Sequence, residues 1–267
     1  MSKRVAVIGC GNMGSAIVRG LLESGWTDAS KVVATNPDPA KARRLSEDLG
    51  VPAITSNRDA CKDADIIILG VKPQIIKGAL TELRDALRDD QIVISIAAGI
   101  SCRFIEYYTG NVPVVRCMPN LSVTVGMGAT VVSSGTHATA EHVALAREIF
   151  ESVGLVEVVP EYLMDAATGL SGTGPMYVFQ LVEAMSDAGV RVGLSRDVAR
   201  RLAMQTVRGS ARLAQVSGEH PAALKDQVTS PGGTAIAALH VLQRNAFHAI
   251  VMDAVQAATQ RSQELGE

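Results

Sequence analysis

The sequence predicts an α/β protein in which a doubly wound parallel sheet precedes an all-helical domain. An apolar run at residues 5–8 leads directly into three glycines with the G-x-G-x-x-G spacing at residues 9–14. Apolar runs of strand length then alternate with helical segments, which is the rhythm of a parallel sheet. From residue 161 onward only helical periodicity remains. We therefore expect a dinucleotide-binding domain of the Rossmann type at residues 1–160 and an all-helical dimerisation and substrate domain at residues 161–267.

The glycine motif gives each glycine a separate physical task. Gly9 allows the tight turn after the strand, Gly11 lets the phosphates of a ligand approach the backbone, and Gly14 lets the following helix lie close to the strand. The unpaired N–H groups at the start of that helix then favour an anion. Gly25 is placed to end the helix. A strand before the glycines and an amphipathic helix after them favour dinucleotide binding over a merely structural glycine turn.

The second strand ends at the position that contacts the adenosine ribose in dinucleotide-binding folds. Folds selective for NAD carry Asp or Glu there, whereas this chain has Asn36. Lys41, Arg43 and Arg44 follow on the next segment. The missing carboxylate and the nearby cations favour the 2′-phosphate of NADPH, with NADH still possible. The alternative is a solvated basic helix face, with Asp38 contacting the ribose.

The remaining elements of the first domain are predicted from apolar runs and the turn residues between them. Continuous apolar runs are typical of central parallel strands, whose carboxyl ends face the ligand crevice. Lys72 follows one such strand and could serve as a catalytic acid, but we favour a role beside the cofactor. The residues assigned to the cofactor are Gly9, Gly11, Asn12, Met13, Gly14, Asn36, Asn57, Val71, Lys72, Pro73 and Ala97. Strands are expected at 31–36, 51–54, 66–71, 91–96, 112–116, 128–133 and 155–159, and helices at 40–49, 75–87 and 140–153.

Helical spacing continues through the second domain to the end of the chain. The last helix would contain about 30 residues and measure ~45 Å at 1.5 Å per residue. A domain of roughly 105 residues cannot cover that length, so we expect a second subunit to pack against it. The helices are expected at 162–170, 177–188, 195–215, 221–227 and 234–265.

Two segments of small residues interrupt these helices, at residues 170–175 and 229–235. In the second segment a Gly-Gly turn leads into Thr234, which we expect to be an extended N-cap of the last helix. Backbone N–H groups and a hydroxyl then converge at a helix N-terminus, which suits a carboxylate. The alternative is that both segments are corners between helices that need close packing.

Composition limits the kinds of partner. The formal net charge is −2 and no block of lysine or arginine stands out, so we expect neither nucleic acid nor an anionic membrane as a partner. No apolar run approaches the ~20 residues of a membrane helix. The cysteines are widely spaced and the histidines lack an H-x-x-x-H pair, so we expect no metal and a reducing, cytoplasmic compartment. Cys10 and Cys117 are expected to be small buried hydrophobic residues.

Six short motifs, spread over nearly the whole chain, match the pattern of one known family. They are residues 9–14, 71–73, 116–120, 170–175, 220–226 and 230–235. On these motifs the chain resembles pyrroline-5-carboxylate reductase. The resemblance implies reduction of a cyclic imine, 1-pyrroline-5-carboxylate, to L-proline with NAD(P)H, in the last step of proline biosynthesis. It also implies a homodimer with interlocked helical domains, often assembled into larger rings, and a site between one nucleotide domain and both helical domains.

The resemblance also assigns roles to residues in the two small-residue segments. Ser171, Thr173 and Thr234 are the expected catalytic residues. Three segments depart from the family pattern. Residues 120–122 read Asn-Leu-Ser instead of Asn-Thr-Pro, and residues 171–177 carry Thr173 and Met176 in place of a serine and an alanine. Ala235 stands where a threonine hydroxyl usually contacts the substrate. The expected substrate-binding residues are Ser230, Gly232, Gly233, Thr234 and Ala235.

Three other functions remain open from the sequence. One is reduction of a different cyclic imine. Another is a 3-hydroxy-acid dehydrogenase, but such enzymes carry a catalytic lysine soon after their small-residue motif, and residues 176–180 contain none. A third is a non-catalytic nucleotide-binding regulator, for which Ala235 offers some support. A protonated imine already has an electrophilic carbon, so the proposed reaction needs position more than acid–base groups.

Overall fold

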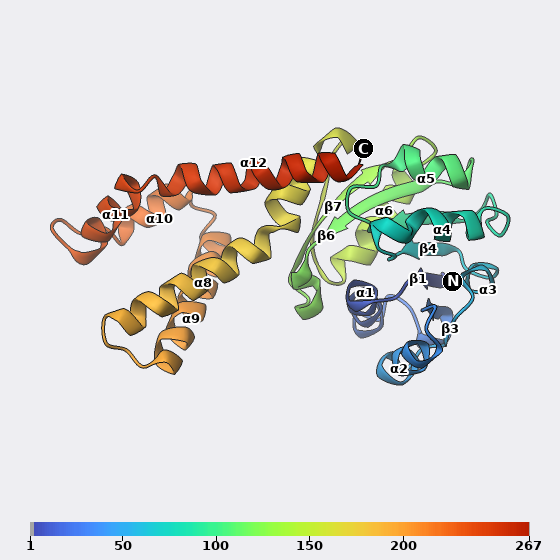
Figure 1. Cartoon of the computed structure of the whole chain (residues 1–267), viewed down its shortest axis with the longest axis horizontal. Helices are drawn as coiled ribbons and strands as arrows, with labels where there is room; N and C mark the ends of the chain where they lie inside the picture. Colours follow the sequence, from blue (N-terminus) through green and yellow to red (C-terminus); the bar gives the residue numbers. More distant parts are fainter. Residues whose placement is uncertain (1–2, 267) are drawn as a thin grey trace. The chain divides into compact units, whose positions relative to one another are not determined.

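The computed structural model describes residues 3–266. An eight-stranded sheet in the order β3-β2-β1-β4-β5-β6-β7-β8 lies at the centre of the first part of the chain (Figure 1). The first six strands along the chain are parallel, as predicted. The strands are β1 (Val5–Ile8), β2 (Val32–Thr35), β3 (Ala53–Ile54), β4 (Ile66–Leu69), β5 (Ile92–Ser95), β6 (Val114–Pro119), β7 (Gly128–Ser134) and β8 (Gly154–Val158).

One strand pair departs from the expected parallel arrangement. β7 runs antiparallel to β6, and β8 runs parallel to β7. The connection from β6 to β7 holds only the short 3-10 helix η2 (Leu121–Val125), which is too short for a parallel crossover. The sheet is therefore mixed at this edge.

Helices cover both faces of the sheet, and each face has its own apolar core. Successive residues of β1 alternate between the two cores: Val5 and Val7 belong to one, and Ala6 and Ile8 to the other. The first core packs against α1 (Asn12–Glu23), α2 (Pro39–Leu49) and α6 (Ala140–Glu151); the second packs against α3 (Asn57–Cys61), α4 (Pro73–Leu83) and α5 (Cys102–Thr109). Neither α3 nor α5 was predicted from the sequence.

The glycine turn has the geometry that its spacing predicts. Gly9 has φ +73°, a left-handed conformation that favours glycine. A Cβ at Gly14 would lie 3.0 Å from Cγ1 of Val7, so the glycine allows α1 to approach β1 closely. Gly25, with φ +71°, follows the C-cap of α1. The predicted strand, turn and helix are confirmed.

The helical part differs from the expectation at two places. The expected helix at 162–170 is replaced by the 3-10 helix η3 (Glu161–Leu163), the short α7 (Met164–Ala167) and the π-helix η4 (Thr168–Gly172). The prediction of a single long terminal helix was wrong, because the helix is interrupted at residues 245–246. Asn245 Nδ2 donates to the carbonyl of Val241, and Ala246 has φ +54°. The other helices are α8 (Gly174–Arg191), α9 (Arg196–Ser217), α10 (Pro221–Gln227), α11 (Thr234–Arg244) and α12 (Phe247–Gly266).

Two compact units make up the described chain. Unit 1 contains the sheet, runs to Thr173 and takes in the chain again from Gln256. Unit 2 is Gly174–Val255 and is entirely helical apart from its connections. The end of α12 joins unit 1 through a hydrogen bond of 2.6 Å from Ser262 Oγ to Asp165 Oδ1. The division into compact units therefore falls after Thr173, whereas the sequence predicts a domain boundary after residue 160. No helix among residues 3–266 combines the length and apolar character needed to cross a membrane.

Candidate functional site

The predicted ligand crevice lies where the connections between strands reverse direction. The chain leaves β1 through α1 toward β2, and it leaves β4 through α4 toward β5 on the other side. In open α/β sheets ligands bind outside the carboxyl ends of strands at such a point. Gly9 and Val71 follow these two strands and lie against each other, since a Cβ at Gly9 would collide with Cγ1 of Val71.

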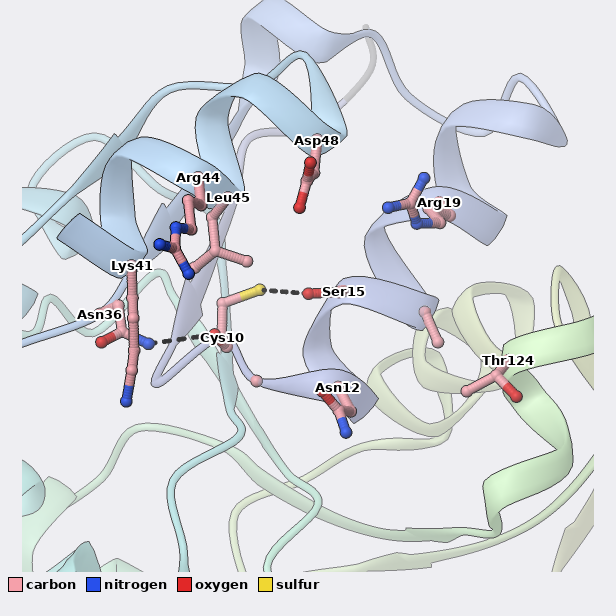
Figure 2. Close-up of a pocket in the computed structure, with 12 residues that line it drawn as sticks. Cys10, Asn12, Ser15, Arg19, Asn36, Lys41, Arg44, Leu45, Asp48 and Thr124 are labelled. Atoms are coloured by element: carbon pink, nitrogen blue, oxygen red, sulfur yellow. Dashed lines mark hydrogen bonds between the residues drawn. The ribbon is translucent and has the colours of Figure 1, made fainter. Parts of the chain in front are cut away.

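A cavity of about 470 Å³ opens beside this point (Figure 2). Gly11 borders it, and a Cβ built on Gly11 meets no atom within 4 Å. The first residue of α1, Asn12, also lines the cavity, where N–H groups of the first turn have no partner within the helix. This open backbone at a helix N-terminus suits a phosphate. The lining residues are Cys10, Gly11, Asn12, Ser15, Ala16, Arg19, Asn36, Lys41, Arg44, Leu45, Asp48 and Thr124.

Basic side chains from α2 gather on the side of the cavity that holds Asn36. Lys41 and Arg44 line it there, whereas Arg43 does not (Figure 2). The carboxylate of Asp38 is engaged in capping α2, because Oδ1 accepts from the N–H of Ala40 at 2.9 Å and from that of Lys41 at 3.4 Å. The arrangement is electrostatically suited to a phosphate group next to Asn36.

The other predicted cofactor residues do not line this cavity. Asn57 is hydrogen-bonded to Thr35, and Thr35 Oγ1 accepts from the N–H of Gly9. Sequence reasoning missed Thr35, although it directly precedes Asn36. The remaining residues are Met13, packed against the first core, Val71, which is buried, Lys72, the exposed N-cap of α4, Pro73, the first residue of α4, and Ala97, whose N–H donates to Ser95 Oγ.

The cysteines near the glycine turn and β6 are buried, as expected. Burial raises the pKa of the Cys10 thiol, against a smaller opposing effect of the hydrogen bond with Ser15. Burial also raises the pKa of Cys117 well above its ordinary value. A raised pKa keeps each sulfur as a neutral thiol at pH 7, so both behave as small apolar residues.

The first small-residue segment, residues 170–175, spans the end of the π-helix η4 and the start of α8. π-helical turns are rare in proteins, and those that occur often lie at functional sites. Ser171 Oγ donates to the carbonyl of Ala167 at 3.0 Å, and Thr173 Oγ1 donates to that of Thr168 at 3.1 Å. Asn120 Nδ2 donates to the carbonyl of Ser171 at 3.0 Å. The predicted catalytic residues Ser171 and Thr173 therefore lie in an unusual turn, which Asn120, the residue after β6, supports through this hydrogen bond.

The second small-residue segment, in unit 2, begins α11. Its N-cap is Gly233, in extended conformation, and Thr234 is the first helical residue. The expectation that Thr234 is the N-cap was wrong by one residue, because Gly232 (φ +67°) makes the turn and Gly233 continues it. A Cβ at Gly233 would collide with Oγ of Ser230. The first N–H groups of α11 follow immediately, in the setting that suits a carboxylate.

An ion cluster around the buried Arg116 was not predicted. Arg116 on β6 has only 6% of its side chain exposed, and its guanidinium lies 3.5 Å from Glu161 Oε1 and 3.8 Å from Asp165 Oδ1. Glu161 also accepts from the N–H of Cys102 at 2.6 Å. The cluster joins β6 to η3 and α7, which lead into η4. A charged residue inside a strand with continuous burial was the signal that could have revealed it.

Comparisons with known proteins cover the whole chain. Residues 161–265 match the family described as pyrroline-5-carboxylate reductase dimerisation, and residues 4–99 match that described as NADP oxidoreductase coenzyme F420-dependent. Pyrroline-5-carboxylate reductase of Arabidopsis thaliana is 41% identical over 100% of this chain and 96% of its own length. The enzyme of Escherichia coli is 39% identical, with 100% of both chains covered.

Solved structures give the same result. The pyrroline-5-carboxylate reductase of Coxiella burnetii superposes with a TM-score of 0.94 at 35% identity, with 100% of both chains covered. The pyrroline carboxylate reductase of Plasmodium falciparum, solved with NADP bound, gives a TM-score of 0.90 at 30% identity over 99% of this chain and 98% of that one.

Proposed function

Because the chain belongs to the pyrroline-5-carboxylate reductase family, we propose that it reduces 1-pyrroline-5-carboxylate to L-proline with NADPH, as the last step of proline biosynthesis. The observation that carries this proposal is the full-length match to curated reductases from plants and bacteria at about 40% identity. The open glycine turn beside a basic cavity supports it, because a dinucleotide phosphate fits there.

In this proposal, the residues of the chain mainly bind and orient the coenzyme and the substrate. NADPH, when bound, supplies a hydride to the imine carbon. The first turn of α1 and the open backbone at Gly11 hold the diphosphate, and Lys41 and Arg44 hold the 2′-phosphate. We assign the segment from Ser230 to Ala235 to the substrate carboxylate, and we keep Ser171, Thr173 and Thr234 as the predicted catalytic residues. A protonated imine carries its own positive charge, so the barrier falls mainly through proximity and orientation.

A direct assay separates this function from its rivals. Purified protein is expected to oxidise NADPH in the presence of 1-pyrroline-5-carboxylate but not in the presence of 3-oxo acids. With NADP⁺ as the oxidant, it is expected to be inactive toward 3-hydroxy acids. Faster turnover of a different cyclic imine would make that compound the substrate. If the protein binds NADPH but turns over none of the cyclic imines, 3-oxo acids or 3-hydroxy acids, the non-catalytic regulator is favoured.

The coenzyme preference gives the first residue-level prediction. NADPH is expected to bind more tightly than NADH, and replacing both Lys41 and Arg44 by alanine is expected to weaken NADPH binding roughly tenfold, through loss of charge-assisted contacts at an exposed site. NADH binding is expected to stay unchanged, and Arg43→Ala is the matched control, because Arg43 lies on the same helix outside the cavity. Fluorescence titration measures both constants. Equal loss of NADH affinity would place the two cations away from the 2′-phosphate.

The substrate segment gives the second prediction. Thr234→Pro removes one backbone donor at the first helical position, where proline is well tolerated and the extended Gly233 suits a following proline. The KM for the imino acid is expected to rise about tenfold, since a hydrogen bond to a charged group is lost, while NADPH affinity stays unchanged. Thr234→Ala removes only the hydroxyl and separates its contribution from that of the N–H. Steady-state kinetics measure the KM. An unchanged KM for Thr234→Pro would indicate that this segment is only a structural corner between helices.

Assembly gives the third prediction. In unit 2, the apolar side chains buried among residues 174–255 are only Ala199 and Ala203, while large apolar residues stay exposed. Exposed apolar residues of this extent indicate a partner surface. We propose a homodimer built on this unit, with a ring of dimers as the larger assembly, in the cytoplasm. Light scattering at micromolar concentration is expected to give at least twice the chain mass, and a monomeric mass would contradict the dimer. The exposed residues include Phe179, Leu181, Leu202, Ile236, Leu242, Ile250 and Val251.

A further inference from the structure

A chain of hydrogen bonds lies behind the glycine turn. The N–H of Gly9 donates to Thr35 Oγ1 at 3.0 Å, and Thr35 Oγ1 donates to Asn57 Oδ1 at 2.7 Å. Asn57 Nδ2 in turn donates to Glu82 Oε2 on α4 at 2.8 Å. We call these four groups the Thr35 relay. It connects the glycine turn after β1 to β2, α3 and α4 with a single line of polar contacts.

The direction of the relay is fixed at its outer end. An ionised carboxylate accepts hydrogen bonds and donates none, so Glu82 orients the amide of Asn57 with its nitrogen outward. The amide oxygen then faces Thr35 and takes the hydroxyl proton. A lone pair of Thr35 Oγ1 is thereby left to accept from Gly9. Each member has one defined role, so the relay specifies a single arrangement of the turn.

The inner end of the relay is Gly9, the left-handed residue of the glycine turn. Thr35 is fully buried, with 0% exposed, and Gly9 is in the left-handed conformation at φ +73°. Thr35 also accepts from the N–H of Cys10 through its own carbonyl at 2.8 Å. Two consecutive N–H groups of the turn are therefore tied to Thr35. The backbone of Gly11 and the start of α1 are left to face the cavity.

We propose that Thr35 is a positioning residue for NADPH, which acts through the Thr35 relay to hold the glycine turn in its phosphate-binding conformation. The proposal rests on the proposed coenzyme function. Thr35 precedes Asn36, so the same residue also sets where the ribose position lies relative to the turn. Its effect is expected in coenzyme affinity, since the substrate segments are not part of the relay.

Thr35→Val tests the hydroxyl directly, because valine keeps the shape and the strand preference of threonine. The Kd for NADPH is expected to rise about tenfold, the effect of leaving a buried donor without its partner. The kcat at saturating NADPH is expected to stay within about twofold. Thr35→Ser is the matched control, since it retains the hydroxyl and is expected to keep the Kd within about twofold of the parent. Thermal melting of each variant separates a loss of stability from a loss of affinity.

An exchange of the outer two members provides an independent test if Thr35→Val does not fold. Asn57→Asp places two carboxylates against each other and is expected to weaken NADPH binding. Adding Glu82→Gln restores a donor facing an acceptor at unchanged net charge, and is expected to recover most of the lost affinity. If the only role of Asn57 were to contact the coenzyme directly, adding Glu82→Gln would not recover the affinity.

The outcomes separate the two claims. A parent protein that does not bind NADPH overturns the proposed function and this inference with it. A parent that binds NADPH, together with a Thr35→Val variant whose Kd is within twofold of the parent, overturns the inference alone. For the exchange, a double variant as weak as Asn57→Asp overturns it.

Discussion

Replacing Gly11 by alanine is expected to weaken NADPH binding about 100-fold while the protein stays folded. A Cβ on Gly11 meets no protein atom within 4 Å, so the folded state accommodates it. The new methyl group would occupy the space through which the diphosphate approaches the backbone. Loss of about two charge-assisted hydrogen bonds accounts for a change of this size. The free energy of unfolding is expected to change by less than about 1 kcal/mol, a value typical of a substitution at an N-cap.

Gly9→Ala is the matched comparison within the same motif. Its left-handed backbone costs a non-glycine residue about 1–2 kcal/mol, and the Cβ would lie 3.1 Å from the backbone nitrogen of Val71. Overpacking against Val71 adds to this cost, so the free energy of unfolding is expected to fall by about 2–5 kcal/mol. The affinity for NADPH is expected to fall as well. Urea unfolding and NADPH titration of both variants distinguish the two glycines. A Gly11→Ala variant with parental affinity would contradict the site assigned here.

Arg116→Ala is expected to destabilise the protein by about 2–4 kcal/mol. Removing one partner of a buried ion pair leaves uncompensated charge, which typically costs 3–5 kcal/mol. The expected value is lower here because Glu161 and Asp165 are 32% and 26% exposed, so water partly hydrates them. For a chain of this size the midpoint of thermal unfolding is expected to fall by about 5–15 °C.

Arg147→Ala is the control for this variant. Arg147 forms a shorter ion pair with Glu151, at 2.7 Å, but the two side chains are 51% and 47% exposed. Exposed pairs of this kind contribute about 0.3–0.5 kcal/mol. Calorimetry is expected to show little change for Arg147→Ala. Equal effects of the two substitutions would mean that burial of Arg116 contributes nothing to the strength of its cluster.

The local features of the first domain could be predicted because they depend on neighbours in sequence. The turn at Gly9, the close packing at Gly14 and the strand at residues 66–69 each follow from glycine spacing or from a continuous apolar run. The family resemblance is confirmed by relatives that match the full length. The roles assigned to individual site residues stay predictions, which the substitutions above test.

The features that could not be predicted depend on residues far apart in sequence. The Thr35 relay joins residues 9, 35, 57 and 82, and no periodicity relates them. The break between α11 and α12 lacks a proline or glycine, and it rests on Asn245 and the left-handed Ala246. Helical spacing continues through it, so the apolar pattern alone indicates one long helix. The π-helix η4 likewise keeps a nearly helical pattern of residues while it changes the hydrogen bonds.

The reaction that we propose for this chain is transfer of a hydride from NADPH to the imine carbon of 1-pyrroline-5-carboxylate. The most direct measurement uses NADPH labelled with deuterium at the transferred position and follows the product by mass spectrometry. Proline that carries one deuterium at the former imine carbon, formed in step with coenzyme oxidation, is the expected result. Oxidation of NADPH without labelled proline, or no oxidation by protein that binds NADPH, would contradict the claim.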